Sequence, residues 1–195
     1  MIKPHLSAHP QATAGLQASL PSSLLRMAVG GVAMAVPIDD VREILEVGRL
    51  TPLPRTPDFV RGVMNLRGAV VPVIDLAARV GMAPISIGRR SCVVVVEAEP
   101  LVIEGDLAAG EAAGEAAGDA LHGALVVGLM VDAVYEVFDV MADGIEPPPA
   151  LGTRIAADFL LGMTRAHGDL IGVLALDRVL AQQELSALIA SHKPH

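Results

Sequence analysis

The strongest constraint on the fold of this 195-residue chain is an internal repeat. A shift of 100 residues aligns one phenylalanine, two glycines and a run of apolar positions with like residues in a second copy; the first-copy members are Phe59, Gly62, Val63, Gly68, Val70, Val71, Val73, Ile74, Leu76 and Val80. A shift of 93 residues aligns the upstream stretch 39–47 with 132–140, and a proline-rich connector follows each stretch. The repeat predicts two similar lobes, each too small to bury its strands alone.

Turn signals between short apolar runs indicate that these lobes are mainly β. Gly30-Gly31 and Arg67-Gly68 each separate two apolar runs and therefore predict hairpins over 24–36 and 59–76. Residue type and spacing predict buried strands at 91–96 and 125–131, a helical turn at 38–41 and a helix at 176–190. The apolar spacing of 42–47 does not decide between helix and strand. Short strands with many turns favour closed barrels over an open sheet.

The composition predicts an aliphatic core, and the distribution of charge marks one acidic segment. Hydrophobic residues make up 52% of the chain and aromatic ones only 2%, so aliphatic side chains must fill the interior. The net charge of −8 is concentrated in 97–119, which holds seven acids and no Lys or Arg. We predict a disordered acidic loop insert at about 99–123, a disordered N-terminal tail at 1–22, a single domain over 23–190 and a C-terminal tail at 191–195. The absence of a basic stripe excludes nucleic acid as a partner.

A search for reactive chemistry gives no candidate site. Cys92, the single cysteine, begins an apolar run and is interpreted as a buried small hydrophobe, which excludes an internal disulfide. The six histidines show no metal-ligand spacing, and no phosphate-binding or nucleophile motif is present. A carboxylate pair between the lobes fails because Asp75 aligns with Ala175. We therefore expect no enzymatic activity, no cofactor and no metal. Without a signal peptide or a 20-residue apolar span, we also expect a soluble cytoplasmic protein without membrane insertion.

The remaining candidate function is recognition, and it centres on Arg67. This arginine is predicted at a hairpin tip before a glycine, where it is either a solvated turn residue or a guanidinium presented to a partner. Glu43 carries the same two interpretations, as a surface charge or an interface residue.

At this point the sequence resembles the CheW family, the adaptor proteins of bacterial chemosensory arrays. The resemblance rests on the runs Val36-Pro37-Ile38, Val41-Arg42-Glu43-Ile44, Thr51-Pro52-Leu53-Pro54, Asn65-Leu66-Arg67-Gly68, Val71-Pro72-Val73-Ile74-Asp75-Leu76 and Val127-Gly128-Leu129-Met130-Val131-Asp132. It covers about 24–188 and implies two intertwined, SH3-like five-stranded β-barrel subdomains around a shared apolar core. It also implies a non-enzymatic coupling protein whose partners are the regulatory domain of a CheA-type histidine kinase and the cytoplasmic hairpin tip of a chemoreceptor, with recruitment to membrane-associated receptor arrays.

The resemblance assigns roles to particular residues. The partner-binding candidates that it implies are Val41, Glu43, Ile44, Asn65, Leu66, Arg67 and Gly68. Family glycines align with Gly62, Gly128 and Gly162, which we interpret as structural turn and packing residues. Two departures stand out: the insert lengthens a loop that is usually short, and His167 occupies the place of Arg67 in the second repeat.

Two alternatives stay open. The same binding chemistry would serve a chemosensory pathway other than swimming, such as pilus motility or surface sensing. A protein of another class, a β-barrel that binds a small ligand between the lobes, would need converging polar groups inside an apolar cavity, and the sequence identifies none.

Overall fold

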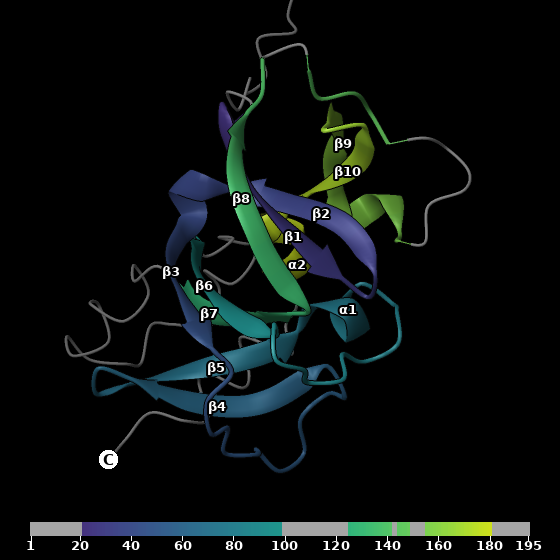
Figure 1. Cartoon of the computed structure of the whole chain (residues 1–195). Helices are drawn as coiled ribbons and strands as arrows, with labels where there is room; N and C mark the ends of the chain where they lie inside the picture. The colour runs from purple at the N-terminus through teal and green to yellow at the C-terminus, as the bar shows by residue number, and fades with distance from the viewer. Residues whose placement is uncertain (1–20, 99–124, 142–143, 149–154, 181–195) are drawn as a thin grey trace, which may run out of the picture.

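The computed structural model describes residues 21–98, 125–141, 144–148 and 155–180, and Figure 1 shows the arrangement of their elements. The elements, in chain order, are β1 Ser23–Val29, β2 Val32–Pro37, η1 Ile38–Asp40, β3 Val41–Glu46, β4 Val60–Leu66, β5 Ala69–Asp75, α1 Leu76–Arg79, β6 Cys92–Ala98, β7 Leu125–Val131, β8 Ala133–Asp139, η3 Ala157–Phe159, β9 Leu160–Ala166, β10 Asp169–Leu174 and α2 Leu176–Leu180. No helix among these residues is long and apolar enough to cross a membrane.

The strands form two five-stranded sheets, each drawn from both repeats. One sheet has the order β8-β1-β2-β10-β9 and the other β3-β6-β7-β5-β4. The first repeat runs from β1 to α1 and the second from β6 to α2, so each sheet combines strands of both repeats. The repeats meet at two places in each sheet. One is a parallel pair, β2 with β10 in one sheet and β5 with β7 in the other, and the second is an antiparallel pair, β1 with β8 and β3 with β6. The predicted intertwined lobes are thereby confirmed, and neither repeat can complete its sheet without the other.

Each sheet curls until its two edge strands approach one another. In the second sheet, β3 and β4 are opposite edges, yet Glu43 on β3 lies 3.1 Å from Arg67 in the β4–β5 turn. In the first sheet, β8 and β9 are the edges, and Glu136 on β8 lies 3.4 Å from His167 in the β9–β10 turn. This curling is consistent with the SH3-like barrels that the sequence predicted.

The hairpins follow their turn chemistry. Gly30 and Gly31 between β1 and β2 have φ of 57° and 75°, and Arg67 and Gly68 between β4 and β5 have φ of 52° and 93°. Two positive φ angles in a two-residue loop are the signature of a type I′ turn, whose twist matches that of the flanking strands. Both predicted hairpins are confirmed, and the β-branched runs form β6 and β7 as expected.

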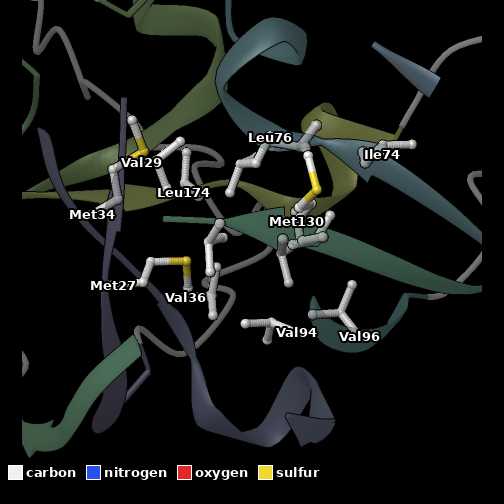
Figure 2. Close-up of a cluster of buried hydrophobic side chains, with 14 of the residues drawn as sticks. Met27, Val29, Met34, Val36, Ile74, Leu76, Val94, Val96, Met130 and Leu174 are labelled. Carbon is white, nitrogen blue, oxygen red and sulfur yellow. The ribbon is translucent and has the colours of Figure 1, made fainter. Parts of the chain in front are cut away.

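One core joins the two sheets, and it is aliphatic. Figure 2 shows its central members, which come from β1, β2, β5, α1, β6, β7 and β10: Met27, Val29, Met34, Val36, Ile74, Leu76, Val94, Val96, Met130 and Leu174. All ten are 5% exposed or less. Methionine fills gaps between the branched side chains because its thioether chain is unbranched and flexible.

Four predictions need correction or restriction. The ambiguous segment 42–47 forms β3, and ordered structure begins before residue 23, because the carbonyl of Ser22 accepts a hydrogen bond from the N–H of Val140 at 2.8 Å. Cys92 is half-buried rather than fully buried. The predicted helix 176–190 is described only over 176–180, where it forms α2. The following parts of the prediction lie outside the described residues: the rest of that helix, the N-terminal residues 1–20, the insert between Ala98 and Leu125, and the tail 191–195.

Candidate docking surface at a duplicated hairpin turn

The β4–β5 turn holds Arg67 in a conformation that arginine rarely adopts. Asn and Gly dominate positions of this kind, because a Cβ is strained at positive φ. Among the described residues only Arg55, Arg67 and His167 are non-glycine residues with positive φ. A side chain kept at a strained backbone position is a candidate for a function that requires that side chain.

The other turn residues build the platform on which Arg67 stands. The side-chain Oδ1 of Asn65 accepts a hydrogen bond from the Gly68 N–H at 2.8 Å and so closes the turn from within. Leu66 is half-buried and packs against the core. Gly68 has φ of 93°, and a Cβ added there would meet no atom within 4 Å, so its role is conformational. Of the four predicted residues, only Arg67 therefore offers a long side chain to solvent.

Strand β3 supplies the carboxylate, and β3 and β5 each supply one exposed apolar residue. The Arg67 guanidinium donates to Glu43 at 3.1 Å, and the two side chains are 81% and 23% exposed. Ile44 and Val70 are exposed large hydrophobics beside this pair in sequence, at 44% and 60%. Val41, also predicted here, is half-buried and packs against the core, so it supports the surface from beneath. The sequence did not single out Val70, although its place directly after the turn was a signal.

A bulge in β3 sets the direction of Glu43. Val41 pairs with Val96 and Ile44 with Val94, so three steps along β3 span only two along β6. An extra residue in one strand twists it locally and redirects side chains at the strand edge. Burial nevertheless alternates regularly along β3, and it is the exposed Ile44 beside the half-buried Leu45 that makes the apolar spacing of 42–47 fit neither helix nor strand.

The predicted structural glycines lie inside strands, not in turns, so that part of the prediction is wrong. Gly62 is in β4, Gly128 in β7 and Gly162 in β9. A Cβ at Gly62 would lie 2.3 Å from the Thr51 carbonyl oxygen, and one at Gly162 would lie 2.6 Å from that of Glu146. Both glycines therefore let a proline-rich connector cross their hairpin. Gly128 packs between strands, since its Cβ would lie 2.6 Å from a methyl of Val93.

Polar groups away from the turn are held by the fold. Asp75 is fully buried, accepts hydrogen bonds from the N–H groups of Ala78 and Ile85, and lies 3.4 Å from Arg61. Burial raises the pKa of the Cys92 thiol above its ordinary value, which disfavours the reactive thiolate. Across the described ranges, no group of three or more His, Cys, Asp or Glu side chains could hold a metal ion.

Comparison with known proteins identifies the fold and its class. A family model described as the CheW-like domain matches residues 23–184, which is most of the chain. This protein belongs to the CheW-like domain family. The CheW-like chain is 31% identical over 164 residues to a chemotaxis protein CheW of Rhizobium meliloti, covering 84% of this chain and 90% of that protein. It is also 33% identical over 141 residues to protein FrzA of Myxococcus xanthus, covering 72% of each.

A solved structure extends the likeness to the whole CheW-like fold. The scaffolding protein TtCheW from Thermoanaerobacter tengcongensis superimposes with a TM-score of 0.65 at 27% identity, covering 93% of this chain and 96% of that one. The resemblance and the mainly β fold class expected from the sequence are both confirmed. Family and fold together make this a scaffold or adaptor of the chemotaxis type.

Proposed function

We propose that this chain couples chemoreceptors to a CheA-type histidine kinase and that the surface around Arg67 is one of its protein contacts. We call the residues Glu43, Ile44, Arg67 and Val70 the lobe-one surface, after the sheet β3-β6-β7-β5-β4 that carries them. The observation that carries the proposal is the strained Arg67, 81% exposed at a rigid turn of a CheW-like fold. The family likeness supports the proposed partners, the recruitment to receptor arrays and the absence of catalysis.

The lobe-one surface has the composition of a protein interface. Exposed Ile44 and Val70 provide apolar area, and arginine is enriched among residues that dominate binding energy. Arg67 makes only an exposed ion pair with Glu43, so its guanidinium can turn to a partner carboxylate at little cost. An exposed cation of this kind favours fast, charge-steered association.

The receptor contact is proposed on a different face. The resemblance implies an apolar groove between the lobes that takes the helical hairpin tip of a receptor, in the manner of a helix-in-groove interaction. Separate faces are what an adaptor needs, because kinase and receptor must be bound at the same time. The likeness to FrzA keeps a pathway other than swimming as the alternative, with the same contacts and a different kinase.

Titration calorimetry with the regulatory domains of the organism's CheA-type kinases tests the proposal. The purified chain should bind one of them saturably, and Arg67→Glu should weaken binding at least tenfold, which is about 1.4 kcal/mol. Its thermal melt should stay close to that of the native chain, because an exposed ion pair contributes only about 0–1 kcal/mol.

The matched control is Arg89→Glu, the same charge change at an exposed residue just before β6. The start of β6 pairs with β7 beside the Asp75 end of β5, which is the end away from the turn, so Arg89→Glu should leave binding unchanged. Equal weakening of kinase binding by both variants would show that the loss comes from the change in net charge, and that Arg67 is not part of the interface. Saturable binding that Arg67→Glu leaves intact would have the same consequence, while leaving the adaptor function in place.

A further inference from the structure

The acidic part of the sequence is attached to the fold beside the lobe-one surface. Ala98 at the end of β6 pairs with Leu125 at the start of β7, so segment 99–124 leaves and re-enters the sheet at one place. Strands β5 and β7 are parallel neighbours and therefore begin at the same end of that sheet. The turn that carries Arg67 leads into β5 at this end. Both ends of segment 99–124 are thus fixed next to the Arg67 turn.

One carboxylate of the acidic stretch 97–119 already contacts a cation here. The stretch begins at Glu97 on β6, whose Oε2 lies 2.6 Å from the Nε of Arg42 on β3. The two side chains are 52% exposed for Arg42 and 38% for Glu97, so the ion pair lies at the surface. Arg42 directly precedes Glu43 of the lobe-one surface in β3. The first acid of the stretch therefore shows the kind of contact that the following acids can make.

The guanidinium groups at this end of lobe one face outward. Arg67 is 81% exposed while its partner Glu43 is only 23% exposed, so the cation is the outer member of the pair. Among the described residues, Arg67 and Arg42 each have a single carboxylate partner. A guanidinium has five N–H donors, so both arginines keep donors for further carboxylates.

Segment 99–124 brings carboxylates without competing cations. It holds six acids and no Lys or Arg; the acids are Glu99, Glu104, Asp106, Glu111, Glu115 and Asp119. A group tethered beside its target has an effective concentration on the order of millimolar, whatever the concentration of the protein. These six carboxylates are therefore present around the Arg67 turn before any partner arrives.

We propose that the carboxylates of segment 99–124 compete within the chain for the Arg67 guanidinium, and so weaken the binding of an acidic partner to the lobe-one surface. The competition needs no single contact, because any of the six acids can pair with the cation. Exposed ion pairs are weak, so a partner is disfavoured and not excluded. Removing the six charges should strengthen partner binding about threefold.

The competition for Arg67 involves this chain alone and is tested without a partner. Only its effect on kinase binding rests on the proposed function, so the two parts of the inference need separate measurements.

A nitroxide spin label on segment 99–124 tests the contact in the full chain. The label is attached to Ala112→Cys in a Cys92→Ser background, which leaves one thiol; Cys92→Ala replaces that background if Cys92→Ser melts early. Broadening of the backbone amide signal of Arg67 then reports how often position 112 comes near the lobe-one turn. The amide of His167, in the corresponding turn of the second lobe, is the control signal.

The matched variant keeps the length of the segment and removes its charge. We call it the neutral variant; its substitutions are Glu99→Gln, Glu104→Gln, Asp106→Asn, Glu111→Gln, Glu115→Gln and Asp119→Asn. Broadening at Arg67 should fall at least twofold in the neutral variant, and also in the native segment when salt reduces the Debye length to about 3 Å. The signal of His167 should change in neither case. Broadening at Arg67 that is equal in both chains, that ignores salt, or that is absent from the native segment would overturn the proposal.

The kinase titration measures the consequence for binding. The neutral variant should bind about threefold more tightly than the native chain, and this difference should vanish when both chains carry Arg67→Glu. Equal affinity of the native and neutral chains would overturn the competition. Absence of kinase binding by either chain would refute the proposed partner instead, while the spin-label result would still decide whether the segment contacts Arg67.

Discussion

Replacing Arg79 tests how the two repeats are held together. Arg79 ends α1 and is 7% exposed, and its Nε donates to the Val179 carbonyl at 2.8 Å. Its guanidinium lies 5.1 Å from the ring centroid of Phe59 and 4.9 Å from that of Phe159, two phenylalanines related by the repeat. One cation thus links both copies at the point where α1 and α2 meet. Arg79→Met keeps an unbranched stem and removes the charge and every N–H donor.

The expected loss follows from these contacts. A hydrogen bond from a charged donor contributes about 1.5–3 kcal/mol, and each cation–π contact contributes about 0.5–2 kcal/mol. Methionine recovers part of the packing and relieves the cost of burying a charge. We therefore expect the free energy of unfolding to fall by about 3 kcal/mol. For a protein of this size the melting temperature should fall by about 10 °C.

Urea unfolding followed by circular dichroism measures the difference. Arg178→Met is the matched control, because Arg178 is the exposed neighbour whose side chain donates to the Asp158 carbonyl at 3.4 Å. Its effect should stay within about 0.5 kcal/mol. A loss below about 1 kcal/mol for Arg79→Met would show that the buried guanidinium does not hold the repeats together, and would refute the reasoning.

Two further predictions concern stability. Burial raises the pKa of Asp40, with the charges of Asp39 and Asp177 adding to the effect, so the folded chain holds this proton more tightly than the unfolded chain. The stability that protonated Asp40 contributes is fully present below its ordinary pKa of 3.8 and is lost as pH rises through its pKa in the folded chain. Asp40→Asn should therefore raise the melting temperature at pH 7. A gain of the same size at pH 3 would contradict this prediction. Gly62→Ala should lower the free energy of unfolding by about 3 kcal/mol, since φ is +131° and the methyl would meet the Thr51 carbonyl. Gly81→Ala, at φ +87° and with no atom within 4 Å of the added Cβ, should lower the free energy of unfolding clearly less. Equal losses for the two variants would show that the close approach of the Thr51 carbonyl to Gly62 does not affect stability.

The sequence predicts what depends on neighbouring residues. Gly30-Gly31 and Arg67-Gly68 specify their hairpins through local backbone preferences, and the β-branched run that begins at Cys92 specifies a buried strand. The repeat adds the existence of two lobes. These features need no knowledge of which strand lies beside which, so turn chemistry and periodicity suffice.

Features that depend on distant partners cannot be predicted in this way. Gly62 fits a turn residue in the sequence, and only the crossing of Thr51 over β4 shows that it makes room for backbone. The strand period of β3 is hidden in the sequence because Ile44 is exposed beside the half-buried Leu45, and that exposure is visible only in the folded chain. Arg26 lies far in sequence from Glu136, so nothing local shows that the two side chains pair at 3.2 Å.

The same limit applies to the candidate site. Arg67 and Glu43 were separate candidates in the sequence, and their pairing at 3.1 Å follows only from the curling of the sheet. The alignment of the repeats nevertheless places Glu136 on Glu43 and His167 on Arg67. What it cannot supply is exposure, which makes Val70 and Leu170 surface residues instead of core.

Coupling itself is tested most directly by reconstitution. Vesicles that carry a chemoreceptor should be sedimented with the CheA-type kinase, with and without this chain, and the kinase in the pellet measured. The account predicts that the chain raises the pelleted kinase severalfold, that Arg67→Glu removes most of the gain and that Arg89→Glu keeps it. Kinase recovery independent of the chain, in a mixture where the chain itself binds neither partner, would contradict the adaptor function.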